Sequence, residues 1–211
     1  MEELLNRLIT AIEFGKRKDA TALTQELLDA GMPPKDILEK GMICAMSSVG
    51  AKFKADEIFV PEVLIAARAM KASMAVLKPT LVEAGIKPKG TIIIGTIAGD
   101  LHDIGKNLVA MMCEGCGLSV IDLGVDVTPE RFVDAVQENK PRIVAISALL
   151  TTTMVNIPSV LEALGTAGLR DHVKVMVGGA PVTQEWATSI GADGYTEDAA
   201  SAAEMAQALI G

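Results

Sequence analysis

The stretch GTIAGDLHDIGKNL, residues 95–108, places one of the two histidines of the chain between two aspartates. It follows the apolar run of residues 91–94, whose isoleucines are typical of a buried strand. The stretch therefore predicts a strand that ends in a polar turn, with His102 flanked by Asp100 and Asp103 at the exit. The role of a histidine at this position depends on which other residues the fold brings near it.

The chain after Gly90 alternates short β-branched runs with segments of helical spacing. Strands are predicted near residues 91–98, 119–124, 142–149, 173–178 and 193–195, and Thr128 and Thr183 are predicted to begin helices. Right-handed crossovers between such strands give a doubly wound parallel sheet. We expect a flavodoxin-like, Rossmann-like α/β fold with the strand order 2-1-3-4-5.

The chain before Gly90 has apolar residues at helical spacing and no β-branched alternation. Breaks at residues 15–19, 31–34 and 53–56 divide it into about four helices, which is typical of an antiparallel bundle with short loops. The segment EAGIKPKG, which ends at Gly90, is rich in breakers. The predicted organisation is a helical cap domain in residues 1–85, a linker in 86–90 and a Rossmann-like domain in 91–211.

Composition excludes some classes of function. The 211 residues carry a formal net charge of −8 and only 3% aromatic residues, which argues against nucleic acid as a partner. No window reaches about 18 uninterrupted apolar residues, so we expect no membrane partner. An odd number of cysteines is typical of a reducing compartment, which predicts a cytoplasmic protein. We interpret Cys113 and Cys116 as structural, and Cys44 as a core residue of its helix.

In a sheet of this order, ligands bind outside the carboxyl ends of strands 1 and 3, where the chain connections diverge. The exits of these strands carry Asp100 and His102 on one side and Ser147, Thr151 and Thr153 on the other. We therefore expect these five side chains to converge on one crevice. Two glycines in residues 178–179 remove side chains at the neighbouring strand end.

Several interpretations of this crevice compete, and the simplest is that His102 is an ordinary loop residue. A phosphate-binding loop is disfavoured because Asp100 and Asp103 would repel a phosphate. A phospho-accepting receiver domain needs an aspartate where the chain has Ser147. A zinc site needs three or four ligands, and His172 is predicted at the opposite end of the sheet. One histidine suffices if a macrocycle supplies the other ligands; Asp100 would then accept its second N–H and Ser147 would hydrogen-bond Asp100.

These residues match a known family. The segment DLHDIG reproduces the DxHxxG signature of base-off, histidine-on cobalamin-binding domains, and ISALLTTTM, VGGA and GADGYTEDA resemble the segments that follow it there. Residues 59–79 are similar to the helical cap of small methyl-carrying corrinoid proteins. The chain thus resembles the corrinoid subunit of three-component methyltransferase systems, and the cobalamin-binding domain and cap of methionine synthase.

The resemblance implies that cobalamin, carried as methylcobalamin, is the cofactor and that His102 is the lower axial ligand of its corrinoid cobalt. Asp100 and Ser147 would carry the proton associated with ligation. The nucleotide tail would enter the crevice between strands 1 and 3. The remaining residues expected to line the cofactor are Gly95, Thr96, Gly99, Asp103, Gly105, Leu149, Thr151, Thr153, Gly178, Gly179 and Tyr195.

The function implied is methyl transfer by a carrier that is not a complete enzyme. Cobalt(I) would accept a methyl group from a substrate held by a partner substrate:corrinoid methyltransferase. A second methyltransferase would pass it to tetrahydrofolate or a thiol, and an ATP-dependent reductive activator would restore cobalt(I). The helical cap would shield the cofactor. A cobalamin-dependent sensor and the small subunit of an adenosylcobalamin mutase remain as alternatives, and the methyl donor is not identified by the sequence.

Overall fold

The computed structural model describes residues 1–210, and the chain divides into two compact units. The first unit comprises Met1–Pro88 together with Glu114–Gly117. The second comprises Lys89–Cys113 and the chain from Leu118 onward. Helices alone form the regular structure of Met1–Pro88, and the sheet lies in the second unit.

The helical unit follows the predicted breaks. Its elements are α1 (Glu2–Glu13), α2 (Arg17–Asp29), α3 (Pro34–Asp36), a π-helix (Ile37–Ile43), α4 (Cys44–Lys54) and α5 (Val60–Glu83). The α3, π-helical and α4 segments follow one another without a break, so the predicted number of four helical segments is confirmed. Their apolar stripes meet in a core that includes Leu8, Ile12, Leu27, Met46 and Leu77, all fully buried.

The interpretation of Cys44 as a core residue is wrong, because its side chain is exposed. The π-helix that precedes it has a wider turn than an α-helix, which changes the phase at which side chains reach the core. Met42, Ala45 and Met46 take the buried positions instead. Cys113 and Cys116 are buried, as a structural role requires.

A buried hydroxyl in α5 provides a test of the helical core. The Ser73 side chain is fully buried, and its Oγ has no hydrogen-bond partner within residues 1–210. Such an orphaned group costs roughly 1–3 kcal/mol. We therefore expect Ser73→Ala to raise the free energy of unfolding of the helical unit by about 1 kcal/mol in urea titrations followed by circular dichroism.

Thr24 supplies the matched control, because it is equally buried but donates to the Ala20 carbonyl at 2.8 Å. Thr24→Val should give no such gain. A stability loss in Ser73→Ala would contradict the assignment of an unsatisfied hydroxyl.

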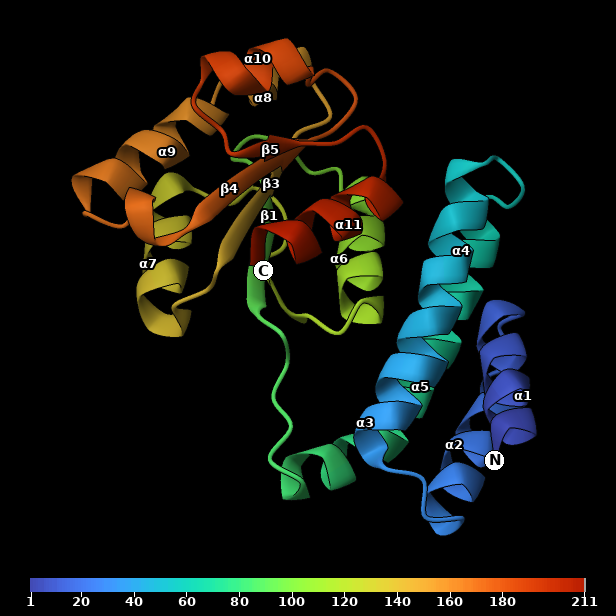
Figure 1. Ribbon diagram of the computed structural model, residues 1–211. Helices are drawn as coiled ribbons and strands as arrows, with labels where there is room; N and C mark the ends of the chain where they lie inside the picture. Colours follow the sequence, from blue (N-terminus) through green and yellow to red (C-terminus); the bar gives the residue numbers. More distant parts are fainter. Residues whose placement is uncertain (211) are drawn as a thin grey trace. The chain divides into compact units, whose positions relative to one another are not determined.

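The second unit contains a five-stranded sheet in which every pairing is parallel (Figure 1). The strands are β1 (Thr91–Thr96), β2 (Ser119–Asp122), β3 (Ile143–Ser147), β4 (Lys174–Gly178) and β5 (Gly194–Tyr195). Their spatial order is β2-β1-β3-β4-β5, so the flavodoxin-like prediction is confirmed. The switch point therefore lies between β1 and β3, as the ligand-crevice argument requires.

Helices cover both faces of this sheet (Figure 1). They are α6 (Ile104–Gly115), α7 (Pro129–Asn139), α8 (Thr151–Met154), α9 (Ile157–Thr166), a short 3-10 helix (Arg170–His172), α10 (Gln184–Ser189) and α11 (Ala199–Ile210). The predicted helix starts are confirmed, because the Thr128 and Thr183 hydroxyls accept hydrogen bonds from backbone N–H groups three residues later.

Side chains alternate between the two faces along each strand. Ile93 of β1, Ile97 directly after it, and Val144 and Ile146 of β3 share a core with Phe132 of α7. The intervening positions face the opposite side, toward α6 and α11. At the carboxyl end of the sheet, three of these positions lie in register on adjacent strands, namely Thr96, Ser147 and Gly178.

No helix in residues 1–210 is long and apolar enough to cross a membrane.

Candidate functional site

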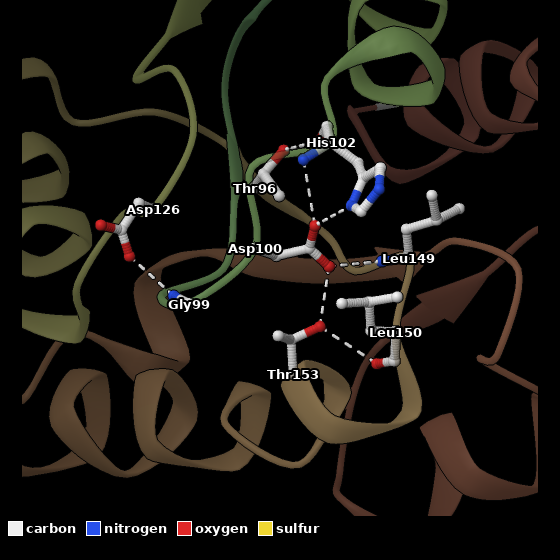
Figure 2. A network of polar contacts seen from close by, with 8 residues as sticks. All are labelled: Thr96, Gly99, Asp100, His102, Asp126, Leu149, Leu150 and Thr153. Carbon is white, nitrogen blue, oxygen red and sulfur yellow. Dashed lines mark hydrogen bonds and ion pairs between the residues drawn. The ribbon is translucent and has the colours of Figure 1, made fainter.

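The turn after β1 is organised around the buried carboxylate of Asp100 (Figure 2). Its Oδ1 accepts hydrogen bonds from the His102 backbone N–H at 3.0 Å and from His102 Nδ1 at 2.7 Å. Its Oδ2 accepts from the Leu149 backbone N–H at 2.7 Å and from Thr153 Oγ1 at 2.7 Å. The exits of β1 and β3, about fifty positions apart in sequence, thus meet at one carboxylate.

These contacts determine the charge on Asp100 and the tautomer of His102. Burial alone would raise the pKa of Asp100, but hydrogen bonds from Leu149, Thr153 and His102 outweigh it and hold that pKa well below its ordinary value. An ionised carboxylate only accepts, so His102 Nδ1 carries the proton and donates it. In the neutral ring this leaves the Nε2 lone pair available to a metal, on a side chain that is 52% exposed.

The predicted hydrogen bond from Ser147 to Asp100 is absent from residues 1–210, and Thr153 donates in its place. Ser147 is the last residue of β3, and its side chain points to one face of the sheet. The chain then turns through Leu149 and Leu150 before α8 begins. This turn directs the third residue of α8 back to the carboxylate. Thr153 is buried, and its contact to Asp100 at 2.7 Å is shorter than its contact to the Leu150 carbonyl at 3.0 Å.

Ser147 belongs to a different feature, a row of small residues at the carboxyl ends of three strands. Thr96, Ser147 and Gly178 lie in register on β1, β3 and β4 and face the α6 and α11 side. A Cβ at Gly178 would meet only the Thr196 carbonyl oxygen, at 3.5 Å. The Thr96 hydroxyl also donates to the His102 carbonyl at 2.9 Å, which ties the row to the histidine turn.

Two predicted lining residues lie away from this row. A Cβ on Gly95 would approach Phe132 to 2.9 Å and Val127 to 3.1 Å, which are core residues of the opposite face. Tyr195 packs against the same core; burial, followed by the charge of Glu197, raises its pKa. A glycine is needed at position 95 because the ring of Phe132 packs against it. Neither Gly95 nor Tyr195 leaves space on the face of the sheet that carries Thr96.

The other predicted residues surround the turn with different roles. Gly99 has φ +85°, and Gly179 has φ +123° with the Ala148 backbone so close that no Cβ fits. Asp103 precedes α6 and accepts from the Asn107 side chain at 3.0 Å, while Gly105 and Thr151 are exposed.

The exposed apolar side chains of the second unit form a set that the sequence interpretation largely missed. Within residues 91–210, the large apolar side chains that are exposed lie in the segments that follow β1, β2 and β3. Leu101 and Ile104, on either side of the His102 and Asp103 pair, are 72% and 75% exposed. The others are Val125, Leu149, Leu150 and Val155. Apolar residues inside an otherwise polar turn were the signal that could have identified them.

The donor set of the second unit limits the kind of metal group that fits. Residues 1–210 contain no cluster of three or more His, Cys, Asp or Glu side chains that could hold a metal ion. One exposed imidazole with an oriented Nε2, set among exposed apolar side chains, suits a cobalt whose other ligands come from a flat apolar macrocycle. The residues present therefore fit a corrinoid.

Comparison with known proteins identifies the family. Two models, both described as a B12 binding domain, match residues 90–204 and residues 4–78. The chain belongs to the B12-binding corrinoid protein family. Trimethylamine corrinoid protein 1 of Methanosarcina acetivorans is 45% identical over 211 residues, covering 99% of this chain and 98% of that protein. The dimethylamine corrinoid protein of Methanosarcina barkeri is 43% identical over 210 residues, with the same coverage.

A solved structure agrees with the sequence relatives. The methanol:cobalamin methyltransferase complex MtaBC of Methanosarcina barkeri contains a chain that superposes with a TM-score of 0.89 at 33% identity, covering 99% of this chain and 80% of that one. The resemblance found in the sequence is thus confirmed. This corrinoid protein binds cobalamin and is a methyl carrier of a methyltransferase system.

Proposed function

We propose that this corrinoid protein carries methyl groups from a methylated amine, bound to a partner methyltransferase, to a second methyltransferase that acts on tetrahydrofolate or a thiol. A reductive activator that uses ATP belongs to the same proposal. The division into a helical cap in residues 1–85, a linker in 86–90 and a cobalamin domain in 91–211 is retained in it.

The observation on which the proposal rests most heavily is the contact between His102 and Asp100. A half-exposed imidazole is held through Nδ1 by a carboxylate that is itself fully buried and accepts four hydrogen bonds. An ordinary loop histidine does not need such support, whereas a metal-binding one does, because the second hydrogen bond fixes the ring and raises its basicity. We assign His102 as the axial ligand, Asp100 as the residue that orients it and Thr153 as the residue that holds Asp100.

When bound, the corrinoid supplies a cobalt centre that takes up a methyl group and gives it away. The chain's own residues prepare the site for it. His102 presents Nε2 to the metal, Asp100 keeps the proton on Nδ1, and the exposed leucines and isoleucine of the surrounding turns offer an apolar face. Thr96, Ser147 and Gly178 are small residues. They therefore leave space above this face of the sheet, where the nucleotide tail is proposed to lie.

The choice of a methylated amine follows from the relatives. Proteins named for trimethylamine and dimethylamine match over nearly their whole length at 42% to 46% identity. The chain of the methanol complex is more distant, at 33% identity. These names favour methyl transfer over the sensor and mutase alternatives. They also support a partner methyltransferase that binds the amine.

A transfer assay tests the donor. The full chain is reconstituted with hydroxocobalamin, reduced to cobalt(I) and mixed with a trimethylamine-specific corrinoid methyltransferase and isotopically labelled trimethylamine. We expect label on the protein-bound corrinoid. With methanol and a methanol-specific methyltransferase we expect at least about tenfold less label, a difference that corresponds to about 1.4 kcal/mol of discrimination. Equal labelling from methanol would contradict the choice of donor, and no labelling from any methylated amine would contradict the proposed function.

A further inference from the structure

The loop between β2 and α7 contacts the histidine turn through Asp126, an exposed residue outside the predicted site. Asp126 Oδ1 accepts a hydrogen bond from the Gly99 backbone N–H at 2.7 Å (Figure 2). In the reverse direction, the Asp126 backbone N–H donates to the Asp100 carbonyl at 3.0 Å. One residue thus holds Gly99 and Asp100, two consecutive residues of the turn that are separated from His102 only by Leu101.

The backbone of Asp126 is adapted to this double contact. Its φ is +54°, one of three positive values among the non-glycine residues of the described chain. Such a conformation is unfavourable for most side chains, although Asp and Asn tolerate it better than others. In this conformation Asp126 makes two hydrogen bonds to the turn, one through its side chain and one through its backbone N–H. An observed backbone outlier of this kind supports a functional constraint.

The loop that carries Asp126 is itself fixed at its beginning. Asp122, at the end of β2, accepts from the Gly124 N–H at 2.8 Å and from Lys106 Nζ at 2.5 Å. Lys106 is only 2% exposed and lies in the first turn of α6, four residues after His102. Beyond Asp126, Val127 N–H donates to the Thr96 carbonyl at 2.9 Å. Asp126 is therefore a rigid support and not the tip of a free loop.

We propose that Asp126 is a positioning residue, which holds the Gly99–Asp100 backbone so that Asp100 can orient His102 toward the cobalt. The inference rests on the proposed role of His102 as axial ligand. Loss of the Asp126 side chain releases Gly99 and leaves the turn free to shift by a fraction of an ångström. Supporting residues outside the ligand set commonly change metal affinity by about 10- to 100-fold when they are replaced.

Three substitutions at Asp126 separate the role of its side-chain acceptor oxygen from that of its positive φ. Asp126→Asn keeps the acceptor oxygen and tolerates positive φ, Asp126→Gly keeps the backbone conformation only, and Asp126→Ala keeps neither. The matched control is Asp198→Ala, since Asp198 Oδ1 also accepts from a backbone N–H, that of Ser201 at 2.8 Å, at the start of α11. All variants are made in the full chain.

The first measurement uses the cofactor-free protein. Amide exchange of Gly99, followed by nuclear magnetic resonance, should be at least about tenfold faster in Asp126→Ala, because a hydrogen bond of about 1.4 kcal/mol protects that group. Asp126→Asn and Asp198→Ala should leave the Gly99 rate unchanged. An unchanged rate in Asp126→Ala would overturn the inference at its first step.

The second measurement uses protein loaded with cobalamin and reduced to cobalt(II), with ¹⁵N-labelled histidine. The ratio of centres that show histidine nitrogen splitting in electron spin resonance to those that do not should fall by about tenfold in Asp126→Ala and less in Asp126→Gly. Asp126→Asn and Asp198→Ala should match the parent chain. If Asp126→Ala accelerates Gly99 exchange but keeps the parent ratio, the tie is purely structural and the inference is wrong. A parent chain without any histidine splitting would instead remove the proposed role of His102.

Discussion

His102→Ala is expected to abolish the ¹⁵N-histidine splitting of the cobalt(II) spectrum and to lower the rate of methyl transfer by more than about tenfold. The reason is that this substitution removes the imidazole that Asp100 holds through Nδ1 and whose Nε2 is the proposed ligand. A loss at least as large as that for supporting residues is expected, since those cost about 10- to 100-fold. The cofactor-free protein should remain folded, because the imidazole is 52% exposed.

His172→Ala is the matched control, because His172 is the only other histidine and precedes β4 at the far end of the sheet. It should change neither the spectrum nor the transfer rate. If His102→Ala left both readouts at the parent level, His102 would be an ordinary loop residue. The assignment of the ligand, though not of the family, would then be withdrawn.

Thr153→Val is expected to lower the free energy of unfolding by roughly 1.5–3 kcal/mol, the usual contribution of a hydrogen bond to a charged group. The valine has nearly the same shape, so the effect isolates the hydroxyl that donates to Asp100 Oδ2 at 2.7 Å. Methyl transfer should fall by about tenfold as well, because a less well held Asp100 orients His102 less firmly. Denaturant titration and the labelled-amine assay measure the two effects.

Thr153→Ser restores the hydroxyl and should recover most of both losses. Ser147→Ala serves as the comparison, since Ser147 makes no hydrogen bond to Asp100 within the described chain, and its effect on stability should stay below about 1 kcal/mol. The opposite order, with Ser147→Ala the more damaging substitution, would show that the contacts around Asp100 differ in solution.

The strand order and the contact between Asp100 and His102 could be predicted because both depend on local pattern. Isoleucine-rich runs separated by helical segments restrict the sheet to few topologies, and residues two apart in a tight turn readily reach each other. The hydroxyl that donates to Asp100 could not be predicted in this way. Ser147, Thr151 and Thr153 all carry hydroxyls near the end of β3, and only the path of the turn decides which one returns to the carboxylate.

Gly95 and Cys44 show two further limits of the sequence interpretation. A glycine in a strand indicates that something approaches closely, but not from which side, and at Gly95 the neighbour is the ring of Phe132. Helical spacing predicted a buried Cys44, yet the π-helix before it changes the angular position of the side chain. Asp126 gave no signal at all, because its role depends on a backbone conformation that composition does not reveal.

The apolar side chains around the histidine turn have a consequence for the life of the protein in a cell. In the chain without cobalamin, an apolar surface that includes Leu101 and Ile104 is exposed to solvent. Exposed apolar surface of this kind promotes aggregation. A ligand that binds only the folded chain stabilises it in proportion to the logarithm of its concentration. We therefore expect the abundance of the protein to follow the supply of cobalamin, because chains without the cofactor would be the more exposed to chaperones and proteases.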